Sequence, residues 1–443
     1  MAWDAAPNLQ QSIEQAGSPM KLLWKPADPW LPPRVEPEYA GWAAEQTAWH
    51  EGVALSDLSY HMWDTFLEGP DVVDFLRSIS ANNYESFAID QAKQFMPVTR
   101  EGYLVGDGIL LREAEERFVL TGAPAAHGWV GYQLGRSGAD VTRTVDSDMG
   151  WRQDDPVLFR LQVQGPLSAQ LVESAFGSLP PESKFFHSVL FEVDGVRIRA
   201  LRHDMAGQSG WEFIGAYADH DRIKDKLLTA GEPLGLVHIG AWAYPTSAIE
   251  SGWVATPVPP IYTDPELADY RSTIGLYSYE GQLPMYGSWY SEDIADYYLT
   301  PYDLDYGRSI SFRHEFLGKE ALQAAKENVR HRKMTLVFDP ADVATVVPAG
   351  EIGLTFAKHR IEKDGRLIGR TEHLANLAPY GTMLALGIVD TADAVPGTSV
   401  TVTWGHHPGA GTPTDADLGF PKLRATLQEA PFSEVARTAY RAN

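Results

Sequence analysis

The stretch LFRLQVQGPLSAQLVESAF, residues 158–176, sets the pattern from which the fold can be worked out. Alternating apolar residues over 158–164 predict a β-strand, and the Gly-Pro pair that follows predicts a tight turn. Residues 167–176 then have the apolar spacing of an amphipathic helix. The same order of strand, Gly-Pro turn and helix occurs in MWDTFLEGPDVVDFLRSI, residues 62–79. The recurrence indicates a weak internal duplication in a protein that mixes helices and strands.

The composition excludes several classes of function. The chain has 443 residues, a net charge of −23 and no cysteine. Thiolate metal sites, iron–sulfur clusters and a cysteine nucleophile are therefore excluded. An acidic protein is poorly suited to a nucleic-acid partner or an anionic membrane, because both attract basic surfaces. Thirteen Trp, 19 Tyr and 17 Phe argue against a disordered chain, and the length suggests two or three domains.

Targeting signals are not evident in the sequence. The opening MAWDAAPNLQQSIEQAG has neither the basic start nor the apolar run of a signal peptide. The most apolar long stretch, residues 227–244, is interrupted by Glu232, Pro233 and several glycines, so it does not read as a membrane span. We therefore expect a soluble, cytoplasmic protein without a membrane partner.

The remaining segments indicate two further blocks of structure. Short strands separated by turns are expected at 95–98, 103–105, 109–112 and 117–121, a pattern typical of a β-meander. One long strand is expected at 191–201. Beyond the basic stretch RHRK, residues 330–333, alternating apolar positions predict several strands. We therefore expect a β-rich C-terminal domain from about there.

Seven short segments carry more information together, in their order and spacing, than any one of them alone. They are E…GVALSD…HM (45, 52–57, 61–62), LEGPD…FL (67–71, 75–76), LQVQGP (161–166), GQSGWE (207–212), IESG (249–252), LPMYG (283–287) and FLGKEAL (316–322). This set resembles the tetrahydrofolate-dependent aminomethyltransferase superfamily, which includes the glycine cleavage T-protein. The resemblance runs from about residue 40 to the C-terminus.

A second group of segments narrows the resemblance. It comprises QAKQF and PVT (91–95, 97–99), VGDGI (105–109), KFF (184–186), LRHDMAG (201–207), AYP (243–245), ESGW (250–253) and PIYT (260–263). These are similar to the folate-dependent aromatic O-demethylases that act on vanillate and 3-O-methylgallate. That branch implies an α+β fold built as a three-domain ring of the T-protein type, with folate in a central channel.

The same resemblance implies a division of the chain into three domains. A discontinuous folate-binding domain would take residues 1–60 and 152–240. A second discontinuous domain would take 61–151 and 241–329. A barrel-like β domain would take 330–443.

The activity implied is methyl transfer from a methoxyaromatic compound to N5 of tetrahydrofolate, which yields a phenol and 5-methyltetrahydrofolate. Tetrahydrofolate would be the methyl-accepting cosubstrate, and no metal or flavin is expected. Such a reaction belongs to lignin aromatic catabolism and one-carbon metabolism. Three alternatives stay open: an S- or N-demethylase of the same superfamily, an aminomethyltransferase that would need a lipoyl carrier partner, and a folate-binding protein without activity.

Two residues carry most of the implied chemistry. Glu212 stands where the family has a pterin-binding Glu, and a fixed carboxylate can accept two hydrogen bonds from the N–H edge of a pterin. Tyr244 matches an essential Tyr of the demethylases. Because Tyr and simple phenols both have a pKa of about 10, the Tyr244 hydroxyl is matched to donate a proton to the departing phenol oxygen.

Other residues are expected to bind the cofactor, each with a structural alternative. Trp253 would stack on the pterin or substrate ring or pack in the core. Gln94 and Gln164 would donate or accept hydrogen bonds, although Gln164 could equally serve the Gly-Pro turn. Arg202 would hold the anionic part of folate or pair internally. Asp107 follows Gly106 where aminomethyltransferases have two aspartates and use the first, which argues against aminomethyl transfer.

The expected substrate contacts depart from the family pattern. His61 matches a pocket histidine and would act in binding and catalysis, unless it is structural. Ala123 stands where vanillate-type enzymes have an Arg that pairs with the substrate carboxylate. Pro32 replaces a pocket Tyr, with Trp30 two residues earlier. Without that Arg, a buried substrate carboxylate would lose a charge-assisted hydrogen bond that contributes about 1.5–3 kcal/mol to the binding free energy. We therefore expect a substrate other than vanillate.

Several minor expectations complete the sequence-based picture. A cationic substrate would predict acidic or aromatic pocket residues, and the aromatic residues Tyr60 and Trp63 are compatible with one. Lys93, Arg100 or Arg202 would form a local basic patch for the glutamate tail of folate. The pair His406-His407 lies beside a Pro-Gly turn without further ligands at metal spacing, so we interpret it as part of a surface loop.

Overall fold

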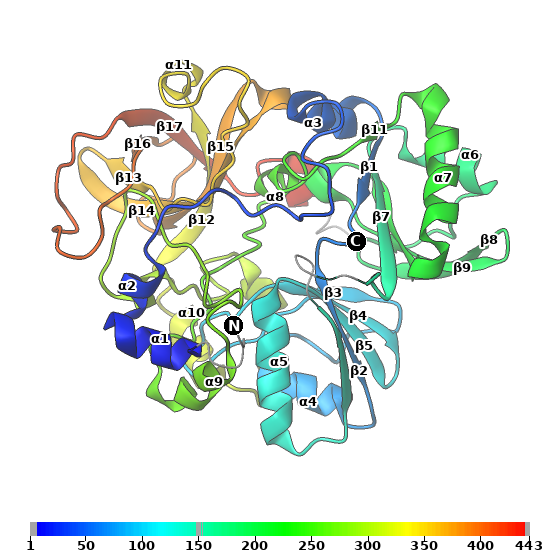
Figure 1. The fold of residues 1–443 in the computed structure, drawn as a ribbon, viewed down its shortest axis with the longest axis horizontal. Coiled ribbons are helices and arrows are strands. Elements are labelled where there is room, and N and C mark those ends of the chain that lie inside the picture. The colour runs from blue at the N-terminus through cyan, green and yellow to red at the C-terminus, as the bar shows by residue number, and fades with distance from the viewer. Residues whose placement is uncertain (1–6, 148–151, 153, 439–443) are drawn as a thin grey trace.

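The structure is a computed structural model that describes residues 7–147, 152 and 154–438 of the chain. Helices and strands are mixed along the sequence, and the strands form three separate sheets. Figure 1 shows these sheets around the middle of the molecule, where α8 lies, with most of the other helices on the outside. The fold class is α+β, as the sequence predicted, and the C-terminal region contains a closed six-stranded barrel.

The first sheet has the order β11-β1-β7-β10-β9-β8. Helices α6 (Ser168–Phe176) and α7 (His220–Gly231) cover one face. Phe159, Leu161 and Val163 of β7 lie in the core under these helices, so the alternate residues of β7 point to the opposite face. The strands span Ala54–Asp57 (β1), Leu158–Gln164 (β7), Ser188–Val193 (β8), Val196–Arg202 (β9), Gly210–Ala216 (β10) and Val237–His238 (β11).

The second sheet has the order β3-β4-β5-β2-β6. Helices α4 (Val72–Ile79) and α5 (Pro124–Ser137) pack on one face, where Leu67, Phe118 and Leu120 are fully buried. The strands span Trp63–Glu68 (β2), Ala92–Gln94 (β3), Gly108–Ala114 (β4), Arg117–Gly122 (β5) and Thr142–Asp146 (β6).

The third sheet is the closed barrel β12-β15-β14-β13-β16-β17. Met334, Leu336, Ile361 and Val402 lie in its core, which explains the alternating apolar pattern seen in the sequence. The strands span His331–Phe338 (β12), Arg360–Lys363 (β13), Arg366–Leu377 (β14), Thr382–Asp390 (β15), Ser399–Thr403 (β16) and Lys422–Glu429 (β17).

Other helices connect and surround the sheets. Helix α1 starts after Asn8, whose side chain accepts from the Gln11 backbone N–H in a capping box. The α-helices are α1 (Leu9–Ala16), α2 (Pro19–Leu23), α3 (Trp42–Glu51), α8 (Thr246–Glu250), α9 (Ala268–Thr273), α10 (Lys319–Lys326), α11 (Pro340–Val343) and α12 (Glu434–Thr438). Short 3₁₀ helices include η2 (Met205–Gly207) and η8 (Ala378–Tyr380). No helix of the described residues is long and apolar enough to span a membrane.

Both Gly-Pro turns place a glycine against another backbone. Gly165 has φ +123°, and a Cβ there would lie 2.5 Å from the carbonyl oxygen of Gly52. Gly69 has φ +151°, and its Cβ would lie 2.3 Å from the carbonyl oxygen of Asp140. Only glycine meets both requirements, the positive φ and the close approach. The Gly-Pro turn therefore has the same role in both units: it directs the helix back over its own sheet.

The structure corrects several expectations from the sequence. Residues 95–98 and 103–105 are not strands, since they form only the isolated bridges Val98–Leu104 and Ser80–Pro97. The long strand expected at 191–201 is interrupted by a turn, so that β8 and β9 form a hairpin. His407 is buried and stacks on Tyr290 with ring centroids 4.7 Å apart, so it is not a surface residue.

The Gly165 turn yields a stability prediction. Substitution Gly165→Ala is expected to lower the free energy of unfolding by roughly 1–3 kcal/mol, because it combines a positive φ with a backbone clash. Urea unfolding of the purified protein would measure the loss. The control is Gly177→Ala, which has φ +80° but open space around the added Cβ, and it should cost less. Equal losses in the two variants would contradict the steric argument.

Candidate active site

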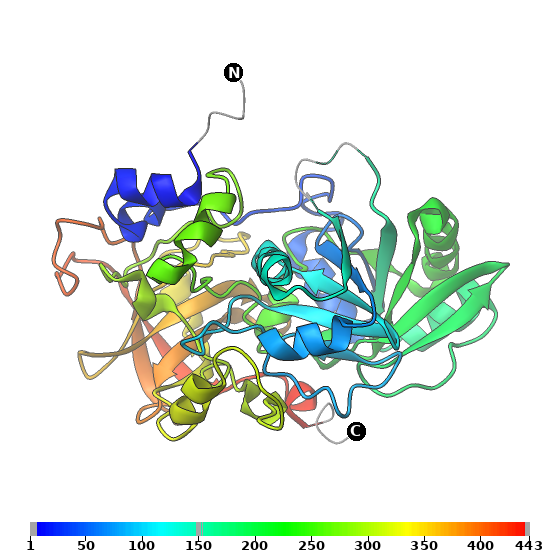
Figure 2. The same ribbon diagram turned by 90° about the horizontal axis from the view of Figure 1, so that it is seen from below.

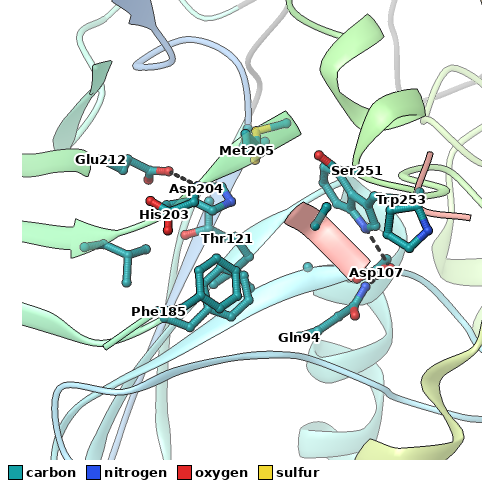
Figure 3. A pocket seen from close by; sticks show the side chains of 18 of the residues that line it. Gln94, Asp107, Thr121, Phe185, His203, Asp204, Met205, Glu212, Ser251 and Trp253 are labelled. Carbon is teal, nitrogen blue, oxygen red and sulfur yellow. Dashed lines mark hydrogen bonds and ion pairs between the residues drawn. The ribbon is translucent and has the colours of Figure 1, made fainter. Parts of the chain in front are cut away.

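A cavity of about 370 Å³ is lined by residues of all three sheets and of the C-terminal segment. Figure 3 shows Glu212 and His203 on one side of it, and Gln94, Asp107 and Trp253 on the other. Apolar side chains such as those of Phe185 and Ile109 also line the cavity. A concave, largely apolar pocket with a few placed polar groups is typical of a small-molecule site.

Glu212, on β10, belongs to a buried ionic network. Arg160 of β7 donates from Nη1 to Glu212 Oε1 (2.9 Å) and from Nη2 to Asp64 Oδ1 (2.7 Å) and Thr121 Oγ1 (2.8 Å). His203 Nδ1 lies 3.4 Å from Glu212 Oε2. Burial alone would raise the pKa of Glu212, but His203 and the Arg160 charge outweigh it and lower that pKa to about 2. Glu212 is therefore an anion at every physiological pH.

Asp107 forms the opposite wall and has a different environment. Its Oδ2 accepts hydrogen bonds from Gln94 Nε2 (2.6 Å), Trp253 Nε1 (2.9 Å) and the Tyr306 hydroxyl (2.9 Å). Its Oδ1 is buried and has no hydrogen-bond partner among the described residues. Burial raises the pKa of Asp107 to about 6, because the three neutral donors offset only part of the lost hydration.

Tyr244 lines the same cavity, just before α8. Its hydroxyl is 3.6 Å from Met205 Sδ, which is a weak acceptor. The His61 ring packs edge-on against the Tyr244 ring, with centroids 4.9 Å apart. Burial and the Glu212 charge raise the pKa of Tyr244 well above its usual value. Tyr244 therefore keeps its proton and can act as a hydrogen-bond donor to a ligand.

Two predicted cofactor residues do not line the cavity. Gln164 donates from Nε2 to the carbonyl oxygen of Met205, so it holds the loop that carries Met205. Arg202 pairs with Asp204 (3.0 Å), and its guanidinium lies over the ring of Trp211. Because Arg202 and Trp211 share the helix-covered side of the first sheet, Arg202 does not point at the cavity.

The predicted substrate residues lie near Tyr244 or farther out. Burial lowers the pKa of His61 to about 4, so its imidazole is neutral. The Tyr60 hydroxyl shares a hydrogen bond with the Tyr217 hydroxyl (2.9 Å) and accepts another from Arg34 Nη1 (3.1 Å). Trp30 is 52% exposed, and Ala123 is the N-cap residue of α5. Of these four residues, only His61 has a ring contact with a residue that lines the cavity, namely Tyr244.

The expected basic patch is not assembled in the structure. Lys93 Nζ donates to the Asn83 carbonyl oxygen (2.7 Å). Arg100 pairs with Glu266 (3.2 Å) on the surface. Neither these residues nor Arg202 lines the cavity. The described residues also contain no group of three or more His, Asp or Glu that could hold a metal ion.

Three important lining residues were not predicted: Arg160, His203 and Tyr306. Arg160 could have been found, since a charged residue between Phe159 and Leu161 in an apolar strand needs a buried partner. Tyr306 could not, because it reaches Asp107 from a connecting segment 199 positions away in the sequence.

Comparisons with known proteins agree with the resemblance. The family described as GCVT N-terminal domain matches residues 16–257. The chain is 35% identical to a syringate O-demethylase of Sphingobium sp. (strain NBRC 103272 / SYK-6), over 98% of each chain. It is 28% identical to a sesamin methylene transferase of Sinomonas sp. (strain No.22), over 90% of each. It is 26% identical to an aminomethyltransferase of Streptomyces avermitilis, over 84% of this chain and 90% of the relative.

A solved structure supports the fold. The glycine cleavage system aminomethyltransferase T from Bartonella henselae aligns with a TM-score of 0.63 and 18% sequence identity, over 96% of each chain. At this identity the likeness bears on the fold alone, and it agrees with the T-protein type of architecture expected from the sequence.

The raised pKa of Asp107 gives a prediction for the protein without ligand. A carboxyl whose pKa rises on folding weakens the folded state as the pH increases from about 4 to about 6. Asp107→Asn should therefore raise the free energy of unfolding by roughly 2–3 kcal/mol at pH 8 and change it little at pH 4. Urea unfolding at both pH values would measure this, with the exposed Asp415→Asn as control. A gain that is equal at the two pH values would contradict the assigned ionisation.

Proposed function

The chain belongs to the family defined by the GCVT N-terminal domain, and we propose that it is a tetrahydrofolate-dependent O-demethylase. It would transfer a methyl group from a methoxyaromatic compound to N5 of tetrahydrofolate and release a phenol and 5-methyltetrahydrofolate. The observation that carries the proposal is one cavity with an ionised carboxylate, Glu212, and a buried, protonated Tyr244 on its walls.

The cavity walls offer the contacts that a reduced pterin requires. Glu212 is held as an anion by Arg160 and can accept from the N–H edge of the ring. Trp253 supplies a flat aromatic surface on the other wall. Asp107 Oδ1, which has no partner in the described structure, offers an acceptor for a further ligand N–H. An unsatisfied buried acceptor is costly without a ligand, which supports a polar occupant of this cavity.

Tyr244 would act on the leaving oxygen. Tetrahydrofolate supplies the nitrogen that accepts the methyl group. The reaction breaks the methyl–oxygen bond, forms a methyl–nitrogen bond and moves one proton from N5 to the phenol oxygen. Burial and the Glu212 charge raise the pKa of Tyr244 well above that of a simple phenol, so the pKa match expected from the sequence is not kept. Tyr244 would instead stabilise the leaving oxygen by donating a hydrogen bond to it as the bond breaks, while N5 supplies the proton. The surrounding walls hold both reactants in place, so proximity supplies much of the rate.

His61 would assist as a neutral neighbour rather than as a charge. Its ring contacts Tyr244, and burial lowers its pKa to about 4. It can therefore orient the phenol ring of Tyr244 or bond to a substrate hydroxyl without adding a positive charge.

We propose the predicted division into three domains on the basis of the sheets. The strands of the first sheet come from residues 54–57 and 158–238, and those of the second from 63–146. The barrel strands come from 331–429. This order supports a chain that passes from the first domain to the second near residue 60 and returns to the first near residue 152.

The substrate class follows from position 123. Ala123 offers no cation at the N-terminus of α5, and Arg160 is already shared between two carboxylates. Lys333, which also lines the cavity, donates from Nζ to the Leu304 carbonyl oxygen (2.8 Å). We therefore propose a methoxyphenol whose recognition does not depend on an ion pair at position 123.

A methyl-transfer assay tests the function. Purified protein with tetrahydrofolate is expected to form 5-methyltetrahydrofolate from a panel of methoxyaromatic compounds, measured by chromatography. Two matched pairs, vanillate with guaiacol and syringate with 2,6-dimethoxyphenol, isolate the carboxylate. We expect kcat/KM for the neutral partner to equal or exceed that for the acid. Faster turnover of vanillate than guaiacol would refute the substrate argument, and methylene transfer without 5-methyl product would refute the reaction.

The role of Tyr244 can be tested separately. Tyr244→Phe is expected to lower kcat by about 10²-fold or more, since it removes the hydrogen bond that stabilises the leaving oxygen. The dissociation constant for tetrahydrofolate should change little. Tyr60→Phe, which alters a hydroxyl outside the cavity lining, is the matched control. Full activity of Tyr244→Phe with a phenolic ether would exclude the donor role.

A further inference from the structure

The hydroxyl of Tyr244 has an unusual hydrogen-bond acceptor. Among the described residues it donates to the thioether of Met205, with 3.6 Å between the oxygen and Sδ. Both side chains are buried, and both residues line the cavity; Figure 3 shows Met205 there. A thioether is a weak acceptor. The proposed function gives the hydroxyl a second acceptor, the leaving oxygen, so its first acceptor bears on how readily it can change partners.

A second hydroxyl near the sulfur does not compete for it. Ser247 Oγ lies 3.8 Å from Met205 Sδ. A hydroxyl has only one hydrogen to donate, and Ser247 Oγ lies 2.7 Å from the Tyr244 carbonyl oxygen, which is the stronger acceptor. The Ser247 proton therefore goes to that carbonyl. The sulfur is left to the Tyr244 hydroxyl.

The backbone around Met205 is held in place on both sides. The Met205 carbonyl oxygen accepts a hydrogen bond from Gln164 Nε2. The Ala206 backbone N–H donates to Ser251 Oγ (2.9 Å). Ala206 has φ +52°, which is uncommon for a residue with a side chain and persists only where the surroundings impose it. The Met205 side chain therefore starts from a fixed position on the cavity wall.

We propose that Met205 is a positioning residue for methyl transfer: its sulfur holds the Tyr244 hydroxyl at the cavity until the substrate oxygen replaces it. The proposal rests on the proposed function. A weak acceptor suits this task, because an oxygen that gains negative charge as its bond to methyl breaks is a far better acceptor. A strong acceptor in place of the sulfur would keep the hydroxyl for itself, and the leaving oxygen would lose its donor. The sulfur forms no covalent bond and takes no proton.

Two substitutions at this position test the proposal on the full-length protein. Met205→Gln keeps the length of the side chain and replaces the sulfur with an amide, whose oxygen is a strong acceptor. Its kcat for 5-methyltetrahydrofolate formation is expected to fall about tenfold or more, while KM for tetrahydrofolate changes little. Met205→Leu keeps the apolar bulk without an acceptor. It is expected to lower kcat only about threefold, the effect of losing one weak hydrogen bond.

A double-mutant cycle with Tyr244→Phe separates positioning from simple packing. Without the hydroxyl there is nothing for the sulfur to hold, so neither Met205 substitution should lower the residual kcat further. The matched control is Met62→Gln. Met62 also lines the cavity, but the Tyr244 hydroxyl does not bond to it. Its effect on kcat, whatever its size, should be the same in the wild-type and Tyr244→Phe backgrounds.

Two results would overturn the proposal: a wild-type kcat in Met205→Gln, or equal effects of the Met205 substitutions with and without the Tyr244 hydroxyl. The second result would mark Met205 as an ordinary packing residue. If the wild-type protein forms no 5-methyltetrahydrofolate from any methoxyaromatic compound, the proposed function itself fails. That outcome is distinct from an active enzyme in which the effects of Met205 and Tyr244 are independent.

Discussion

The active site depends on one buried guanidinium. Arg160 donates to Glu212 on its own sheet and to Asp64 on the second sheet. Each of these charges would be expensive to bury alone, and breaking such a network costs about 3–5 kcal/mol. The bridge therefore fixes the two sheets against each other and also holds Glu212 as an anion at the cavity. Because one residue serves both purposes, the site is tied to the way the sheets meet.

The same burial has opposite outcomes for the acids around the cavity. Glu212 faces a full positive charge, and its pKa falls to about 2. Asp107 faces only neutral donors, and its pKa rises to about 6. Tyr244 has the Glu212 charge nearby and holds its proton. The cavity thus combines a permanent anion, a carboxyl that titrates near neutrality and a phenol that stays protonated. Ligand binding, titration and hydrogen-bond donation therefore reside on different groups.

The sequence predicted local structure better than contacts between distant segments. The strand, Gly-Pro turn and helix units were correct because their signals are local: apolar period, turn residues and helix spacing. The strands expected at 95–98 and 103–105 were wrong, since pairing depends on partners that the segment itself does not specify. Arg202 was expected at the site, but its place on β9 puts it on the helix-covered side, with Trp211. A one-residue difference in strand position reverses the face, and sequence alone did not fix it.

The close packing of α5 bears on which one-carbon group is transferred. Aminomethyltransferases, by the resemblance, use the first of two adjacent aspartates, and this chain has Gly106 there. A Cβ at Gly106 would lie 2.9 Å from the Ala126 backbone nitrogen and 3.3 Å from Ala125 Cβ. The first turns of α5 therefore occupy the space that an aspartate would need. Restoring it would require α5 to move, together with Ala123 at its start. In this chain the absence of that aspartate therefore goes together with the close packing of α5.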